Sequence, residues 1–270
     1  MSVLKRNAVN ISGSGDRPIV FLHGYGCDQT MWRHIARHFE ASRKVVTFDH
    51  VGSGKSDRHV YDRARYATLH AYADDFIEIL EAGELTGVDA IGHSVGGMIT
   101  LLAAGKRPDL FNRIMMLGSS PCYLNLGGYQ GGFDREGIEE LLAFLEMSLQ
   151  GWSSYLAPLV MANADRPELT AELENYFVSN DPDIMHDFAR VIFLSDHRAD
   201  LAAVTTPALI MQCRDDIISP PQVGEFMQAQ IRGSDRVLLN TQGHYPHLSD
   251  PDAVREAMIA WLGEAAQKAA

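Results

Sequence analysis

Short apolar runs alternate along the chain with longer segments whose apolar positions recur at helical spacing. Most of the runs are unbroken stretches of aliphatic and β-branched residues, which is typical of strands buried on both faces of a sheet. They predict strands over residues 18–22, 45–49, 88–91, 113–117, 208–212 and 236–240. The amphipathic patterns predict helices over residues 28–40, 69–81, 95–106, 222–230 and 251–264. Regular alternation of this kind predicts the α/β class, with a mostly parallel, doubly wound sheet and helices on both of its faces.

One region breaks the alternation, because no strand pattern occurs between residues 122 and 195. Pro, Gly and Asn-Asp signals divide it into four helical patterns, over residues 136–149, 151–161, 167–178 and 181–194. A helical insertion between two strands predicts a cap, or lid, over the sheet. The expected division is therefore a core formed by residues 1–121 and 196–270 and a cap formed by residues 122–195.

Composition and charge narrow the class of protein. The formal net charge is −12 in 270 residues, which disfavours nucleic acid or an anionic membrane as a partner. No apolar run approaches the ~18 residues that span a bilayer, and the N-terminus lacks the features of a signal peptide. Cys27, Cys122 and Cys213 show no metal-type spacing. We therefore expect a cytoplasmic protein with reduced thiols.

The central motif is Gly92-His93-Ser94-Val95-Gly96, which lies between a predicted strand and a predicted helix. A nucleophile elbow requires that context, and glycines flanking the serine relieve clashes in its tight turn. The helix N-terminus then directs backbone N–H groups and positive dipole toward the serine oxygen. The motif alone also fits a turn without chemistry, but the flanking elements favour Ser94 as a nucleophile.

Candidates for the acid and the base follow two later strands. Asp215 and Asp216 come after strand 208–212, and the D-x-x-x-P spacing to Pro220 favours Asp216 over its neighbour. His244 follows strand 236–240 and is the favoured base, whereas His247 lies nearer the next helix and suits a structural role. The order Ser, Asp, His along the chain is the one expected for the α/β-hydrolase fold.

The oxyanion hole is expected from the turn His23-Gly24-Tyr25-Gly26, directly after strand 18–22. The backbone N–H of Tyr25 would join that of Val95 in holding the developing negative oxygen, and each such donor is worth about 3–4 kcal/mol. An ordinary glycine turn is the alternative. A nearby Gly54-Lys55-Ser56 is not a phosphate loop, because that pattern needs glycine where Asp49 stands.

Several runs, most of them outside the catalytic motifs, carry a family resemblance. These are residues 24–29, 48–54, 92–96, 120–125, 151–152, 193–198 and 243–247. With them the chain resembles the RsbQ group of α/β-hydrolases, which are bacterial stress-response regulators related to the plant strigolactone and karrikin receptors. The resemblance covers nearly the whole chain.

The resemblance implies a four-helix cap over an apolar pocket and the triad Ser94, Asp216 and His244. It further implies that aromatic side chains line the pocket, namely Tyr25, Phe133, Trp152 and Phe193. Ordinary packing within the cap is the alternative for these aromatics. His23 and Tyr25 differ from the residues expected in RsbQ itself, so a different pocket shape is expected.

The function expected from these features is hydrolysis of a small, mostly hydrophobic ester or lactone through an acyl-enzyme, with no metal or organic cofactor. The alternative is an RsbQ-like signalling protein that binds or slowly hydrolyses such a ligand and activates a stress-pathway phosphatase. Haloperoxidase-like perhydrolysis ranks lower. Haloalkane dehalogenation is disfavoured, because its nucleophile is Asp and this elbow carries Ser94.

Overall fold

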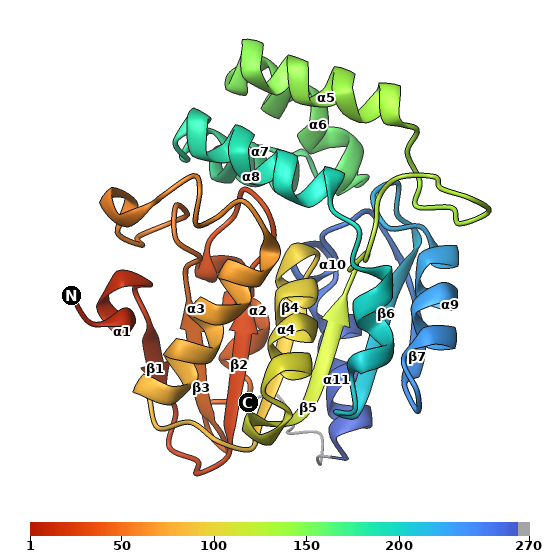
Figure 1. The fold of residues 1–270 in the computed structure, drawn as a ribbon. Helices are drawn as coiled ribbons and strands as arrows, with labels where there is room; N and C mark the ends of the chain where they lie inside the picture. The colour runs from red at the N-terminus through yellow and green to blue at the C-terminus, as the bar shows by residue number, and fades with distance from the viewer. Residues whose placement is uncertain (264–270) are drawn as a thin grey trace.

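The computed structural model describes residues 1–263 and contains one seven-stranded sheet (Figure 1). The strand order is β1-β3-β2-β4-β5-β6-β7, and every neighbouring pair is parallel except β1 with β3. The strands are β1 (Asn10–Ser12), β2 (Pro18–Leu22), β3 (Lys44–Phe48), β4 (Val88–His93), β5 (Phe111–Leu117), β6 (Ala208–Asp215) and β7 (Asp235–Gln242). The mostly parallel sheet confirms the predicted fold class.

Helices cover both faces of the sheet (Figure 1). On one face, α3 (Leu69–Ala82) packs against α4 (Val95–Lys106), and α9 (Pro221–Gln230) packs against β6 and β7. On the other face, α2 (Arg33–Ala36) and α10 (Pro246–Ser249) contact α11 (Pro251–Leu262). The central strands β2 and β4 are buried along their whole length, as strands between two helical layers must be.

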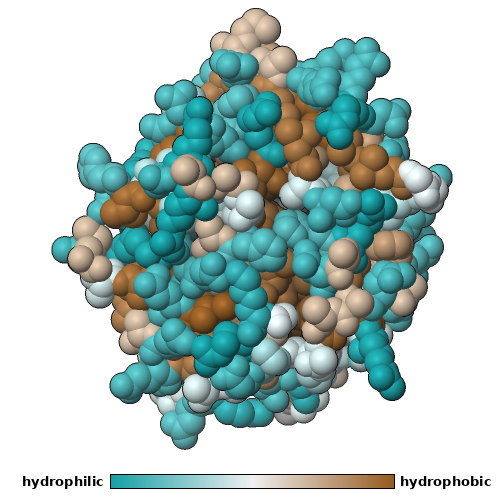
Figure 2. All heavy atoms as spheres, in the orientation of Figure 1, coloured by the Kyte–Doolittle hydropathy of each residue, from teal (hydrophilic) through white to brown (hydrophobic). Residues whose placement is uncertain are grey.

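Four helices lie between β5 and β6 in the chain and stand above the end of the sheet where the parallel strands finish (Figure 1). They are α5 (Arg135–Met147), α6 (Leu149–Met161), α7 (Pro167–Val178) and α8 (Pro182–Leu194). We call these four helices the cap. The segments that lead into and out of the cap meet in a short antiparallel bridge between Cys122 and Asp196. In Figure 2 the apolar surface of this view gathers mainly in its upper part, over the cap.

At the N-terminal side one expectation was wrong and one strand was not predicted. The predicted helix 28–40 is a 3-10 helix, η1 (Gln29–Trp32), followed by the single-turn α2 and further turns. The apolar side chains at helical spacing are buried as predicted, but i→i+3 hydrogen bonds replace α-helical ones after Ile35. Strand β1 was missed, because its three residues are mostly exposed and carry no alternating pattern.

The remaining elements are short turns of helix, and no long apolar helix is present in the described part of the chain. The short helices are α1 (Val3–Arg6), η2 (Arg58–Val60), η3 (Pro108–Leu110) and η4 (Arg198–Ala203). Within residues 1–263 no helix has the length and apolar character needed to cross a bilayer. Residue 264, where the last predicted helix was expected to end, lies outside the described residues.

Candidate active site

Ser94 occupies a sharp turn between β4 and α4. Its φ of 54° and ψ of −121° lie in a region that side chains rarely adopt. A Cβ on Gly92 would lie 2.2 Å from the carbonyl oxygen of Gly96, so only glycine fits there. The two glycines therefore allow the turn to close tightly enough to present the serine at the start of a helix.

The loop after β2 packs directly against this turn. A Cβ on Gly96 would lie 2.5 Å from the carbonyl oxygen of His23, and a Cβ on Gly24 would lie 2.3 Å from Nδ1 of His93. The segment that carries Tyr25 consequently lies beside the start of α4. Val95 is the first residue of α4, so its N–H has no carbonyl acceptor within the helix. The two backbone groups expected to form an oxyanion hole thus come from adjoining segments.

Asp216 and His244 meet in the loops that follow β6 and β7. Oδ2 of Asp216 lies 2.7 Å from Nδ1 of His244. Its other oxygen, Oδ1, accepts hydrogen bonds from the backbone N–H groups of Ile218 at 2.8 Å and Ser219 at 3.2 Å. The neighbouring Asp215 is exposed. Among the described residues, the carboxylate that hydrogen-bonds the ring of His244 is that of Asp216 and not that of Asp215. The carboxylate that orients His244 is therefore the one favoured by the sequence spacing.

The backbone of His244 is held on both sides. Its N–H donates to the carbonyl oxygen of Val160 in α6 at 2.7 Å, and its own carbonyl accepts from Nε2 of His93 at 2.7 Å. Burial holds the pKa of His93 well below its usual range, with smaller contributions from the nearby histidines. A neutral ring with its proton on Nε2 satisfies this hydrogen bond.

His247, the alternative base, lies outside this arrangement. Its ring packs against Trp32 with centroids 4.8 Å apart and against His93 at 4.3 Å. Neither ring nitrogen has a hydrogen-bond partner among the described residues. Burial lowers the pKa of His247 well below its usual range, so the ring is neutral and part of the packed interior.

Ser94 and His244 face the same small apolar cavity, of about 30 Å³. The cap contributes side chains from α6, α7 and α8, and the core contributes loops. The lining residues are Tyr25, Ser94, Tyr123, Leu156, Val160, Phe177, Ile192, Phe193, Ile218, His244 and Tyr245. A larger hollow of about 810 Å³ lies near α1 and β1, and its lining does not include Ser94, Asp216 or His244.

The expected aromatic lining divides into two layers. Tyr25 and Phe193 line the cavity, whereas Trp152 and Phe133 are not among its lining residues. Trp152 is fully buried behind Tyr25, in an edge-on contact with centroids 6.0 Å apart. Phe133 packs edge-on against Phe193 at 6.3 Å. Both outer aromatics support the wall without facing the cavity.

Sequence reasoning did not single out several residues of the wall, above all Tyr123, Phe177 and Tyr245. Tyr123 lines the cavity beside Ser94, and burial raises the pKa of its phenol above its usual range. Tyr123 lies in the run 120–125 and Tyr245 directly follows His244. Both could have been predicted as wall residues, because they neighbour motifs already identified in the sequence. Phe177 had no such signal, because its position depends on how the cap folds over the sheet.

The group of side chains that could hold a metal ion in the described part of the chain does not lie at Ser94. Within residues 1–263 one group of three such side chains lies close enough to hold an ion, and it stands at the base of the cap, formed by His70, His197 and Asp200. The cavity itself offers a hydroxyl, an imidazole and apolar walls, which suits acyl transfer to serine.

The chain resembles known proteins over almost its full length. A family model described as "Alpha/beta hydrolase family" matches residues 19–257. The strigolactone esterase RMS3 of Pisum sativum is 38% identical over 90% of this chain and 91% of its own length. The Karrikin insensitive 2 receptor CA of Petunia hybrida is 37% identical over 93% of each chain.

A solved structure agrees closely with the fold. A hydrolase from Oleispira antarctica is 39% identical, and it superimposes with a TM-score of 0.94 over 97% of both chains. The sheet, the flanking helices and the inserted cap helices are therefore those of an α/β-hydrolase fold.

Proposed function

The chain belongs to the α/β hydrolase family, and from that premise we propose that it cleaves a small, mostly hydrophobic ester or lactone by a serine mechanism. One observation carries this proposal. Nδ1 of His244 hydrogen-bonds Oδ2 of Asp216 at 2.7 Å. His244 also lines the same apolar cavity as Ser94, which lies on a strained turn. A base oriented by a carboxylate and lining the same cavity as a serine hydroxyl is the arrangement that activates a serine nucleophile.

The first half of the reaction forms the acyl-enzyme. Ser94 Oγ attacks the carbonyl carbon of the substrate while His244 takes the hydroxyl proton. The backbone N–H groups of Tyr25 and Val95 hold the resulting oxyanion. Asp216 accepts a hydrogen bond from Nδ1–H of His244, so it maintains the tautomer whose Nε2 is the base and stabilises the imidazolium. Collapse of the intermediate expels the alkoxide, which leaves as an alcohol with the proton from His244.

The second half releases the acid. Water loses a proton to His244 and attacks the carbonyl carbon of the ester on Ser94. The second tetrahedral intermediate uses the same two N–H donors and collapses to a carboxylic acid and free serine. For a lactone both products are parts of one hydroxy acid.

The walls of the cavity support a hydrophobic substrate. Leu156, Ile192, Phe177 and Ile218 present no polar side-chain atoms, and burial raises the pKa of the Tyr25 phenol, which stays neutral. A volume of about 30 Å³ is far below the ~300–1,000 Å³ of a typical ligand pocket. The cap or its side chains must therefore move to admit a substrate.

The experiment that tests the proposal measures product per protein molecule from a short-chain p-nitrophenyl ester. Wild-type protein is expected to turn over many times and to carry a transient acyl group detectable by intact mass. Ser94→Ala is expected to lose both signals, whereas Ser14→Ala, an exposed serine elsewhere, keeps them. Full turnover by Ser94→Ala would refute the serine mechanism.

A second candidate function is a receptor of the RsbQ type that binds or slowly hydrolyses its ligand and activates a stress-pathway phosphatase. Three features support it: relatives named as receptors, the small apolar cavity, and large apolar side chains exposed on the cap. Met147, Tyr155 and Leu159 are 79%, 56% and 44% exposed. Such side chains on a cap above a ligand cavity suit a surface that reports ligand binding to a protein partner.

The same ester assay separates the two candidates. A receptor is expected to release about one product per protein and then stall with the ligand attached. Hydrogen exchange of the cap amides is then expected to slow when the ligand binds. Sustained turnover without any change in cap protection would exclude the receptor role.

A further inference from the structure

Two histidines and an aspartate meet where the cap returns to the core. His70 lies in the first turn of α3, and His197 and Asp200 lie at the start of η4. The potential ligand atoms of the three side chains all lie within 4.8 Å of one another. The two imidazole rings are 5.5 Å apart and nearly perpendicular. His197 is only 7% exposed, so this group is largely closed to solvent on one side.

Two ring nitrogens of this cluster have no hydrogen-bond partner among the described residues. Nδ1 of His197 lies 2.8 Å from Oδ2 of Asp200, which assigns the ring proton to that nitrogen. Its Nε2 is buried and has no hydrogen-bond partner among the described residues, and the same holds for Nδ1 of His70. Buried polar atoms without partners cost free energy, so two in one place require an explanation.

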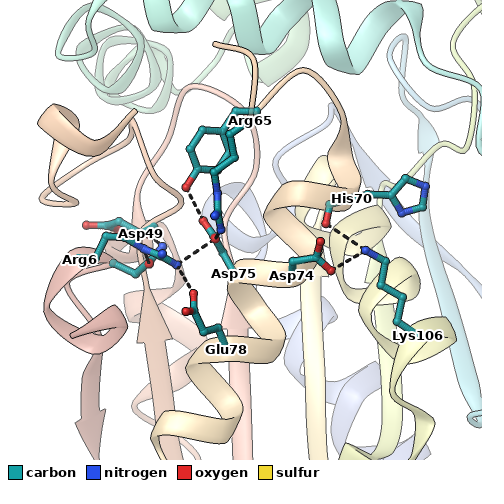
Figure 3. Close-up of polar contacts among 10 residues, drawn as sticks. Arg6, Asp49, Arg65, His70, Asp74, Asp75, Glu78 and Lys106 are labelled. Carbon is teal, nitrogen blue, oxygen red and sulfur yellow. Dashed lines mark hydrogen bonds and ion pairs between the residues drawn. The ribbon is translucent and has the colours of Figure 1, made fainter. Parts of the chain in front are cut away.

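Lys106 holds the backbone of His70 beside this cluster. A neutral imidazole is the form that binds metals. The ammonium of Lys106 is paired with Asp74 at 2.5 Å and also donates to the carbonyl of His70. Figure 3 shows that carbonyl turned toward Lys106 while the imidazole ring of His70 extends away from Asp74.

We propose that His70, His197 and Asp200 form a binding site for a divalent transition-metal ion of the zinc type. His70 Nδ1 and His197 Nε2 are the nitrogen ligands, and the Asp200 carboxylate orients His197 and supplies negative charge. This matches the carboxylate–histidine–metal arrangement common in metalloproteins. A tetrahedral ion with bonds of ~2.0–2.2 Å holds its ligand atoms ~3.3 Å apart. The ligand atoms, which lie within 4.8 Å of one another without an ion, therefore move closer together when the ion binds, and water completes the coordination sphere.

The position of the site gives the metal a structural role. The N–H of His197 donates to the carbonyl of Pro121 at 2.8 Å, and Asp196 pairs with Cys122, so the segments that lead into and out of the cap meet here. Phe193, four residues before His197, lines the cavity beside Ser94. An ion shared between α3 and η4 would attach the base of the cap to the core and resist its opening. This inference does not depend on the reaction at Ser94.

The experiment titrates chelator-treated full-length protein with ZnCl₂ in a calorimeter, and with MgCl₂ in a separate run. One zinc ion per protein and no magnesium binding are expected, since imidazole nitrogen suits zinc and not magnesium. His70→Ala and His197→Ala are expected to weaken zinc binding by at least tenfold, and Asp200→Asn by about tenfold. The exposed His59→Ala serves as the matched control and is expected to bind as wild type does.

A second readout guards against variants that fail to fold. Co²⁺ added to wild-type protein is expected to give visible absorption bands that Asp200→Asn alters and His197→Ala abolishes. Circular dichroism confirms that each variant is folded. Zinc binding that persists unchanged in folded His70→Ala and His197→Ala would overturn the proposal, as would wild-type protein that binds no zinc.

Discussion

The backbone N–H of His244 donates a hydrogen bond to the carbonyl oxygen of Val160 over 2.7 Å. Val160 belongs to α6, so the loop that carries the proposed base is attached directly to the cap. Gly243, the preceding residue, has a φ of +80° and lies so close to α6 that a Cβ would be 2.2 Å from the carbonyl oxygen of Met161. Displacement of α6 would therefore move His244 relative to Asp216.

This attachment predicts that Gly243→Ala lowers kcat by about 10²-fold, because a shift of ~1 Å in a catalytic group can cost that much. Gly233→Ala is the matched control, since its φ is +73° but a Cβ there meets open space. Both variants carry the left-handed backbone cost of about 1–2 kcal/mol. Ester turnover and urea midpoints of the two variants separate the effects. Wild-type kcat in Gly243→Ala would contradict the coupling.

Asp216→Asn is expected to lower kcat by about 10⁴-fold, because an amide at Oδ2 favours the wrong histidine tautomer. The side-chain oxygen of Asn can still accept the N–H bonds of Ile218 and Ser219, so the unfolding midpoint should change little. Asp215→Asn, one residue away and exposed, is expected to keep wild-type kcat. Loss of activity in Asp215→Asn alone would reverse the assignment of the acid.

Local rules explain why the proposed triad could be derived from the sequence. The elbow at Ser94 needs glycine at defined neighbouring positions, and Asp216 and His244 each follow a predicted strand, of which only the one before Asp216 is largely buried. The cavity wall could not be predicted in the same way. Trp152 is buried behind Tyr25, and Phe177 faces the cavity instead, because the rotation of each cap helix follows from packing among all four. Strand β1 escaped detection because hydrogen bonds to β3, and not burial, define it.

Leu156→Ala is expected to enlarge the cavity and to raise kcat/KM for bulkier esters by about tenfold relative to acetate esters. Leu145→Ala is the matched control, since Leu145 is equally part of the cap core but does not line the cavity. Both truncations should lower the free energy of unfolding by about 2–5 kcal/mol. Rates over a series of acyl chain lengths check the prediction. Identical chain-length profiles in the two variants would show that this cavity does not hold the acyl group.

The fully buried His247 predicts that stability falls in mild acid. Burial is the largest cause of its lowered pKa, and His244, Arg33 and His34 lower it further. In the unfolded chain the pKa returns to about 6.5. Below about pH 6.5 the unfolded state therefore binds a proton that the folded state does not, so the free energy of unfolding decreases as the pH falls. The contribution is fully present above that pH and is lost toward the depressed pKa of the folded state.

His247→Phe tests this directly, because phenylalanine can keep the ring contacts with Trp32 and His93 but cannot titrate. Urea unfolding from about pH 8 down to pH 5 is expected to show a shallower acid limb in the variant, by up to ~1.4 kcal/mol per pH unit. Some acid dependence should remain, because burial also lowers the pKa values of His50 and His93. Parallel acid limbs in the two proteins would contradict this prediction, because they would mean that His247 does not contribute to the loss of stability in acid.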